Sequence, residues 1–294
     1  MNRSIAICKL LKSNVRQFEI TPYRHSSQSR EVIVENLHGK HNGIVVIGVN
    51  RPERKNALGV NLVSQLKTEL DRVSYEEKAR VVVIKSLVRG TFCAGADLKE
   101  RLKMPVDEMK QFSLQLRSLM TKVNHLPVPV IAAMDGLAMG GGLELALACD
   151  LRIASKCAKL GLVETGLAII PGAGGTQRLP RLINPAKAKE LIFTAALLNG
   201  EEAEKLGIVN HVVEQNENGN SSYLKSLEIC EKMLQNGPVA LKMAKAAINR
   251  GLEVDIHTGI AIEEAYYAQV IPTKDRMEAL LAFQEKRKPN FKGE

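Results

Sequence analysis

The 294-residue sequence contains no tryptophan, and aromatic side chains make up only 4% of it. Proteins that bind single-stranded nucleic acid usually stack its bases on exposed aromatic side chains, so this composition disfavours that class. No apolar run approaches the roughly 18 uninterrupted residues of a membrane-spanning helix. The sequence therefore predicts no membrane insertion, and its length and 45% hydrophobic content predict a globular fold with a large aliphatic core.

Disulfide and metal-ligand patterns are absent as well. The cysteines are five in number, widely spaced and without a CxxC pair, which predicts free thiols in a reducing compartment. The six histidines show no HExxH or other ligand spacing, so the sequence predicts no metal site.

Three common catalytic motifs are also missing from the sequence. There is no GxxxxGK[ST] phosphate loop, and no glycine cluster completes a GxGxxG followed by an acidic residue at the expected distance. A GxSxG nucleophile elbow is absent too. Nucleotide hydrolysis and nicotinamide chemistry therefore have little support.

Positive charge is unevenly distributed along the chain, whose formal net charge is +9. Residues 1–30 contain six arginine or lysine side chains but a single acidic one, Glu19. Apolar residues are interspersed among these bases in "MNRSIAICKLLKSNVRQFEI", and the serine-containing "HSSQSR" follows. A basic, amphipathic, acid-poor N-terminus predicts a mitochondrial transit peptide, with a disordered basic tail as the alternative. In either case we expect the folded part to begin at about residue 31.

After residue 30, strand-like and helix-like segments alternate. The runs "EVIVENL" and "GIVVIGVN", joined by "HGKHN", predict a β-hairpin. A helical pattern over residues 58–73 precedes the apolar strand "ARVVVIKSL", and a second helix, "VDEMKQFSLQLRSLMTKVNHL", precedes the strand "PVPVIAAMDG". This order predicts an α/β layered domain over residues 31–220. From Pro185 onward helices are expected almost continuously, and residues 221–294 form a C-terminal helical region.

Glycine is concentrated in three segments, each close behind a strand-like run: "GTFCAGADLKE" (90–100), "MGGGLELA" (139–146) and "IIPGAGGTQRLPR" (169–181). Glycine before a helix lets the backbone approach a ligand, and the free N–H groups of the first helical turn attract negative charge. Two such turns facing each other could form an oxyanion hole. The alternative for each segment is a tight turn or close packing without a ligand.

Two carboxylates lie beside these glycines. Glu144 follows the glycine triplet in an apolar run, where an isolated ionised carboxylate would lose hydration that nothing in the run replaces. Glu164 lies in "LGLVETGLAII", also between apolar residues, and could alternatively be a helix N-terminal or surface-turn residue. Two carboxylates in a dry pocket can differ in protonation, one acting as base and the other as acid. Such a pair can add water across a double bond.

With these motifs the sequence resembles the enoyl-CoA hydratases of the crotonase superfamily, from about Ile33 to the C-terminus. The segments that carry the resemblance, in order along the chain, are "NRPERKNAL", "FCAGADLKE", "IAAMDGLAMGGGLELALACD", "GLVETGLAIIPGAGGTQRLPR" and "FQEKRKPNFKGE". The resemblance implies a spiral of repeated ββα units followed by helices that build a homotrimer or a homohexamer. It also implies that no cofactor is needed, since coenzyme A is part of the substrate.

The resemblance assigns roles by position. The backbone N–H groups of Ala96 and Gly141 would hold the thioester oxygen and stabilise the charge that develops on it. Glu144 would activate the water that attacks Cβ, Glu164 would supply or remove the proton at Cα, and the Gly172 N–H would orient the water. The positions implied to contact coenzyme A are Lys55, Ala57, Leu58, Ala96, Asp97, Leu98, Lys99 and Gly141, together with Phe283 and Lys286, which would reach its adenine or phosphate end, in one version from a neighbouring subunit.

The stretches "ADLKERLKM" and "IEEAYYAQVIPTKDR" are most similar to a mitochondrial branch of the family that hydrates 3-methylglutaconyl-CoA in leucine breakdown. A related mitochondrial branch of enoyl-CoA hydratase domain proteins is similar over the same stretches. The resemblance thus implies a location in the mitochondrial matrix and leaves short-chain enoyl-CoA of fatty-acid β-oxidation open as the substrate.

Three alternatives to hydration remain. The first is binding of AU-rich RNA, which in the similar branch depends on a lysine-rich helix after "KNAL". Here the segment from Lys55 to Arg80 contains five basic and four acidic side chains, and so small an excess of positive charge gives little support for phosphate binding. The second is another acyl-CoA reaction of the family, such as isomerisation, and the third is a catalytically silent scaffold. Retention of both glutamates and both oxyanion positions favours hydration.

Overall fold

The computed structural model describes residues 29–294. The predicted transit peptide, apart from its last two residues, lies outside the described residues, as does Cys8. The four cysteines in the described part of the chain are free thiols, and Cys157 alone among them is exposed. None of the helices in residues 29–294 combines the length and apolar composition needed to cross a membrane.

The larger of two sheets has six strands in the order β1-β2-β3-β5-β7-β10. Strands β1 and β2 are the predicted hairpin and pair antiparallel, whereas every other pair in this sheet is parallel. The strands are β1 (Val32–Asn36), β2 (Ile44–Val49), β3 (Val81–Ser86), β5 (Val130–Met134), β7 (Leu151–Ser155) and β10 (His211–Val213).

The smaller sheet has four short strands in the order β4-β6-β8-β9. Three times in succession a strand of the large sheet is followed along the chain by a strand of the small one, as β3 by β4, β5 by β6 and β7 by β8. This repetition is the ββα spiral that the family resemblance implies, and the expected α/β fold class is confirmed. The small strands are β4 (Thr91–Cys93), β6 (Leu137–Met139), β8 (Lys159–Gly161) and β9 (Leu198–Asn199).

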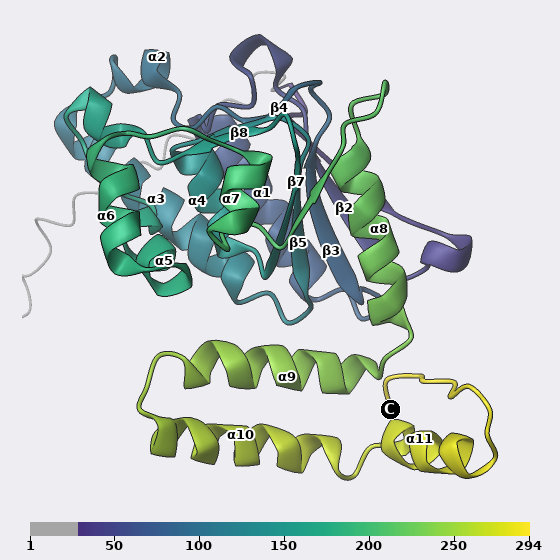
Figure 1. The fold of residues 1–294 in the computed structure, drawn as a ribbon. Coiled ribbons are helices and arrows are strands. Elements are labelled where there is room, and N and C mark those ends of the chain that lie inside the picture. The colour runs from purple at the N-terminus through teal and green to yellow at the C-terminus, as the bar shows by residue number, and fades with distance from the viewer. Residues whose placement is uncertain (1–28) are drawn as a thin grey trace, which may run out of the picture.

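Helices cover both faces of the large sheet (Figure 1). Along β3, Val82 and Ile84 face the main core with the first helices, whereas Val81 and Val83 face α8, because successive side chains of a strand point to opposite faces. The helices of the body are α1 (Val60–Ser74), α2 (Leu98–Arg101), α3 (Val106–Asn124), α4 (Gly141–Ala148), α5 (Gly175–Leu182), α6 (Pro185–Phe193), α7 (Gly200–Lys205) and α8 (Ser221–Leu234).

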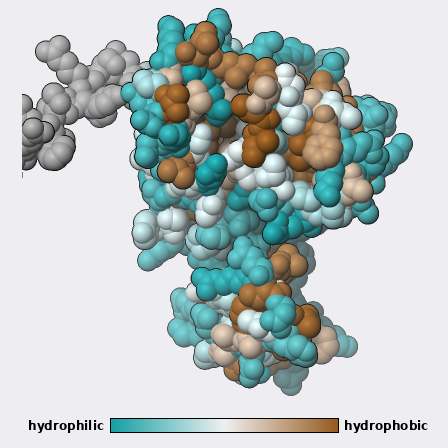
Figure 2. Space-filling model, turned by 90° about the vertical axis from the view of Figure 1, so that its left-hand side faces the viewer, coloured by the Kyte–Doolittle hydropathy of each residue, from teal (hydrophilic) through white to brown (hydrophobic). Residues whose placement is uncertain are grey.

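The last three helices extend away from this body (Figure 1). Helices α9 (Pro238–Gly251) and α10 (Ile256–Val270) pack against each other, and α11 (Lys274–Gln284) follows. The largely buried ammonium of Lys245 ties α9 to the body through a 2.7 Å ion pair with Asp150. Figure 2 shows apolar side chains at the end of the α9–α10 pair and, separated from them by mostly polar residues, in the upper part of the body. These helices thus expose many apolar side chains, among them Leu252, Ile256, Ile260, Tyr267, Leu280 and Phe283.

The sequence prediction was wrong on one point in this half of the chain. The helices expected almost continuously after Pro185 are interrupted by β9 and β10, each two or three residues long and at a sheet edge. Such short strands carry too few residues to show a periodicity of two. Helix α8, which the sequence groups with the C-terminal helices, packs on the large sheet.

Candidate active site

A cavity of about 490 Å³ opens between α2, α3, the start of α4 and the turn η3 (Glu164–Leu167). Most of its wall is apolar or backbone, and its ionisable side chains are two glutamates and two arginines. The structure thus brings together three glycine-rich segments that are far apart in the sequence. Of the residues that the sequence singled out, those lining the cavity are Leu58, Ala96, Leu98, Gly141, Glu144, Glu164 and Gly172.

Two backbone N–H groups meet at one end of this cavity. A Cβ atom added to Gly141 would lie 4.0 Å from the amide nitrogen of Ala96, so the two amides are neighbours. The peptide before Ala96 is turned by Gly95, whose φ of +94° is readily adopted only by glycine. Within residues 29–294, neither the Ala96 N–H nor the Gly141 N–H, which begins α4, donates to a protein acceptor. This is the arrangement that can hold an oxyanion.

Glu144 lies in the first turn of α4 and is only 3% exposed. Its Oε1 accepts hydrogen bonds from the backbone N–H groups of Ala173 at 2.8 Å and Gly175 at 2.7 Å. Burial raises the pKa of this carboxyl, and the two N–H groups, which favour the ionised form, oppose that rise. A Cβ on Gly175 would lie 3.0 Å from Oε1, so glycine there permits the close approach. Glu144 is therefore a fixed, hydrogen-bonded carboxylate.

Glu164 reaches the same cavity from the first residue of η3. It lies beside the glycine triplet, since a Cβ on Gly140 would stand 3.1 Å from its Oε1. Its Oε2 is buried and has no hydrogen-bond partner among the described residues. Burial, reinforced by the nearby charge of Glu144, raises the pKa of Glu164 to about 7. The expected contrast in protonation between the two carboxyls is present: one is poised as a base and the other as an acid.

Two arginines line the cavity that sequence reasoning did not identify. Arg101 is the last residue of α2, and Arg117 lies on α3, where its Nε–H donates to the Gly172 carbonyl at 2.8 Å. The sequence did contain an indication of Arg101. It lies three residues after Leu98 on one short helix, so the two side chains share a face. No feature of the sequence indicated Arg117, because it is an exposed residue of a long amphipathic helix.

A buried ion cluster holds the segment that carries Ala96 in place. Arg51 contacts Asp97 at 2.9 Å, Glu100 at 2.8 Å and Glu31 at 3.2 Å, and it also donates to the Ala57 carbonyl. Asp97 in turn caps α2 by accepting from the backbone N–H groups of its second and third residues. The Asp97 side chain is 3% exposed and thus has a structural role beside the cavity.

The other positions expected to contact coenzyme A lie outside the cavity wall. Lys55 is exposed on the loop between β2 and α1, Lys99 is exposed on α2, and Ala57 is buried directly before Leu58. Phe283, on α11, and Lys286, just after it, are exposed on the extended C-terminal helices, well separated from α2 (Figure 1). Neither residue lines the cavity that holds Glu144 and Glu164.

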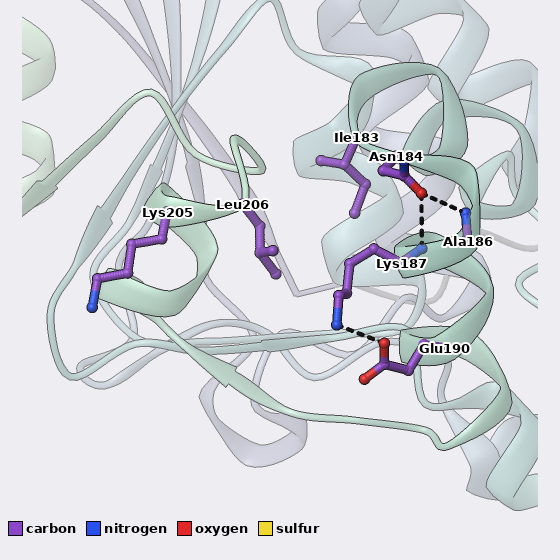
Figure 3. A pocket seen from close by; sticks show the side chains of 7 residues that line it. All are labelled: Ile183, Asn184, Ala186, Lys187, Glu190, Lys205 and Leu206. Carbon is purple, nitrogen blue, oxygen red and sulfur yellow. Dashed lines mark hydrogen bonds and ion pairs between the residues drawn. The ribbon is translucent and has the colours of Figure 1, made fainter.

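A second hollow of about 420 Å³ lies between α6 and α7 (Figure 3). Three of its four polar side chains have local partners: Asn184 caps α6, and Lys187 pairs with Glu190 at 2.6 Å on the same helix. It is lined by neither Glu144 nor Glu164 and by neither Ala96 nor Gly141, so it is not the candidate active site.

The helix expected to bind RNA in the alternative reading has largely paired charges. On α1, Arg72 contacts Glu69 at 2.9 Å and Glu76 at 3.4 Å, and Asp71 pairs with Lys122 of α3. Paired, interspersed charges do not form the basic stripe on which phosphate binding depends.

Comparison with known proteins agrees with this geometry. The profile of the enoyl-CoA hydratase/isomerase family matches residues 39–294. The chain is 56% identical over 264 residues to the human protein methylglutaconyl-CoA hydratase, mitochondrial, covering 90% of this chain and 78% of that one. It is 52% identical over 268 residues to the mouse enoyl-CoA hydratase domain-containing protein 2, mitochondrial, covering 91% and 90%. The crystal structure of an enoyl-CoA hydratase from Bacillus anthracis superposes with a TM-score of 0.86 at 46% identity, covering 90% of this chain and all of that one.

Proposed function

The chain belongs to the enoyl-CoA hydratase/isomerase family, and from its cavity we infer that it is an enoyl-CoA hydratase, which adds water reversibly across the 2,3 double bond of an enoyl-CoA thioester. One observation carries this inference: Glu144 and Glu164 line the same cavity as the two free N–H groups of Ala96 and Gly141. Isomerisation moves a proton within the substrate, and one carboxyl can remove it and return it, whereas hydration must deprotonate a water molecule and protonate Cα at two separate places. The unequal protonation of the two carboxyls provides that pair.

The proposed reaction begins with the thioester carbonyl oxygen between the Ala96 and Gly141 N–H groups. The oxygen of a water molecule forms a bond to Cβ while the water gives a proton to the Glu144 carboxylate. The π electrons move toward the thioester oxygen, where the two N–H groups stabilise the enolate charge. The Glu164 carboxyl then gives its proton to Cα. The proton on Glu144 returns to Glu164 through solvent, so water is added with no net change in the enzyme.

The names of the relatives limit the range of candidate substrates. One similar protein is named for methylglutaconyl-CoA, and another is named only as an enoyl-CoA hydratase domain protein. We propose a short enoyl-CoA, with 3-methylglutaconyl-CoA of leucine breakdown as the leading candidate and short-chain enoyl-CoA of fatty-acid β-oxidation as the second.

A hydration assay with the full chain tests the proposal. Crotonyl-CoA and 3-methylglutaconyl-CoA are offered separately, and loss of the absorbance of the conjugated double bond is followed. The matched variants are Glu144→Gln and Glu164→Gln, which keep the size of each side chain. Both should lose at least about 100-fold in kcat, as expected for removal of a general acid or base, while saturated butyryl-CoA still binds. Near-normal turnover in either variant, or no hydration by the wild type, overturns the proposed function.

Location and assembly are part of the same proposal. We propose that residues 1–30 direct the protein to the mitochondrial matrix, a proposal supported by the mitochondrial names of the relatives. We also propose a homotrimer or homohexamer that assembles through α9–α11, because their many exposed apolar side chains would be buried against other copies of the chain. Light scattering should give three or six times the mass of one chain, and a monomer at micromolar concentration would contradict the assembly.

A further inference from the structure

Arg117 joins two walls of the cavity through one hydrogen bond that the proposed reaction does not use. Its Nε–H, on α3, donates at 2.8 Å to the carbonyl oxygen of Gly172, in the turn before α5. Within residues 29–294 this carbonyl accepts no other hydrogen bond. Both residues line the cavity although 55 positions separate them in the sequence, so the bond ties α3 to a turn of the site.

The peptide group that Arg117 holds also carries a donor to Glu144. The Gly172 carbonyl and the Ala173 N–H belong to the same peptide group, and the described chain has no cis peptide bond. A trans peptide is planar, so its C=O and N–H point in opposite directions and the orientation of one fixes the other. The Ala173 N–H donates at 2.8 Å to Oε1 of Glu144. Arg117 and Glu144 therefore bind the two ends of one rigid group.

The turn has little else to fix this peptide group from outside. Gly172, which precedes it, is exposed, and glycine allows backbone angles that other residues avoid. Arg178 donates at 3.1 Å to the next carbonyl, that of Ala173, but Arg178 belongs to α5, into which the turn leads. Arg117 is thus the contact that holds the turn from a distant part of the chain.

The hydrogen bond from Arg117 also acts on Glu144 electrostatically. A donor on a peptide carbonyl polarises the peptide group and strengthens the bond that its N–H gives. The bond from Ala173 favours the ionised form of Glu144 and opposes the rise of its pKa on burial. The charges of Arg178 and Arg101 lower this pKa directly, and Glu164 lies in the same cavity. Arg117 forms neither an ion pair nor a hydrogen bond with Glu144, so its effect passes through the peptide group.

We propose that Arg117 is a positioning residue for hydration, which holds the Gly172 carbonyl and so keeps the Ala173 N–H directed at Glu144, the base that activates water. This inference rests on the proposed hydratase function and deepens it. It adds a residue that acts through a peptide group and not on the substrate.

A direct test observes the Ala173 N–H by nuclear magnetic resonance. The sequence contains two Gly-Ala pairs, which end at Ala96 and Ala173. Glycine labelled with ¹³C at its carbonyl and alanine labelled with ¹⁵N therefore select two amide signals, and Ala96→Ser assigns them by removing one. At about pH 8, above the pKa of about 7 of Glu164, Arg117→Met should move the Ala173 proton signal upfield because its bond to the carboxylate weakens. The Ala96 signal should stay in place. An unmoved Ala173 signal overturns the inference.

Turnover gives a second readout, and because Arg117 is exposed its variants should fold. In Arg117→Met, kcat for crotonyl-CoA should fall about 10-fold, which corresponds to one hydrogen bond to a charged group, whereas the affinity for butyryl-CoA should change little. The acid limb of kcat/KM should move to higher pH, because the ionised form of Glu144 is less stabilised. Arg117→Lys keeps a charged donor and should recover part of each effect.

Arg181→Met is the matched control. Arg181 is an exposed arginine that donates to a backbone carbonyl within its own helix, that of Gln177 on α5, and its removal should leave kcat and the Ala173 signal unchanged. If Arg117→Met weakens butyryl-CoA binding but leaves kcat and the Ala173 signal as in wild type, Arg117 binds substrate and the inference is wrong. If wild type hydrates no enoyl-CoA, the hydratase function fails, and the Ala173 signal still decides whether Arg117 orients this N–H.

Discussion

Glu144 and Glu164 line one cavity with unequal hydrogen bonding. Oε1 of Glu144 accepts hydrogen bonds from two backbone N–H groups, whereas Oε2 of Glu164 is buried without a hydrogen-bond partner among the described residues. Two backbone N–H bonds to the ionised form offset part of the effect of burial on the pKa of Glu144. At Glu164, burial and the Glu144 charge outweigh a backbone hydrogen bond and the Arg101 charge, and its pKa rises to about 7. Below about pH 7, and above the pKa of Glu144, the pair therefore holds one proton, mainly on Glu164, which is the state that water addition needs.

This coupling predicts the pH dependence. The active free enzyme carries one proton on the pair, so kcat/KM for hydration should fall as the pH rises through about 7, where that proton is lost. It should also fall in acid, once Glu144 is protonated. Because water addition releases no net proton, kcat/KM for dehydration should show the same bell. Rates are measured from about pH 5 to about pH 9 in both directions. A kcat/KM that keeps rising above pH 7 would show that Glu164 is not the proton donor.

The sequence identified both glutamates because each is a lone carboxylate between apolar residues. It could not identify their partners. The N–H groups on Glu144 come from Ala173 and Gly175, which lie in a glycine-rich segment where several neighbouring N–H groups look equivalent in sequence. Which of them points at Glu144 depends on the turn before α5 and on how α5 packs against α4, and both are tertiary features.

The fold shows the same limit. The long elements follow from apolar periodicity, as for α1, where Leu62, Leu66 and Leu70 are all fully buried. Periodicity does not reveal what an apolar face packs against. Helix α8 is amphipathic like α9, but α8 lies on the sheet and α9 extends beyond it. Arg101 was missed for a related reason, since its cavity is formed by segments that meet only in the folded chain.

Gly141→Ala should reduce catalysis without unfolding the protein. The added Cβ would stand 3.0 Å from a Leu58 methyl group and 4.0 Å from the Ala96 nitrogen, so it enters the space where the thioester oxygen binds. The backbone N–H of residue 141 remains, but the methyl group obstructs the approach of the thioester oxygen, so kcat should fall by an amount comparable to the loss of one oxyanion donor, about 100- to 1000-fold. The thermal midpoint should stay near that of wild type, because only a flexible side-chain end has to move.

Gly237→Ala is the matched control for that substitution. Gly237 precedes α9, its φ is negative, and an added Cβ would meet only the Ala240 methyl group at 3.8 Å. Activity should be unchanged. Equal loss of activity in the two variants would mean that the effect of Gly141→Ala is general and does not arise at the oxyanion hole.

Arg51→Met should strongly destabilise the fold. The substitution leaves Glu31 and Asp97, both at most 5% exposed, without their common partner. Removing one member of a buried ion cluster typically costs about 3 to 5 kcal/mol, because the remaining charges stay buried. The free energy of unfolding is measured in urea, with Arg72→Met as control. Arg72 forms an exposed intrahelical pair, for which about 0.5 kcal/mol is expected. A loss at Arg51 no larger than at Arg72 would contradict the structural role of the cluster.

Glu164→Gln should stabilise the protein in a pH-dependent way. The pKa of Glu164 is raised from 4.5 to about 7 in the folded chain, so the stability associated with its protonated form is complete below about pH 4.5 and is lost as the pH rises through 7. Glutamine cannot ionise and avoids that loss. The free energy of unfolding of Glu164→Gln relative to wild type should therefore increase by up to about 3 kcal/mol between about pH 4.5 and pH 8.

Urea unfolding measures this difference, and the protein concentration is kept fixed because assembly also affects stability. Glu77→Gln, at an exposed position outside the proposed α9–α11 interface, is the control. A pH-independent difference for Glu164→Gln would mean that the Glu164 carboxyl titrates alike in the folded and unfolded chain. If the predicted trend is found, the ionised form of the proton donor Glu164 destabilises the fold. This loss of free energy of unfolding grows over the same pH range in which Glu164 loses its proton.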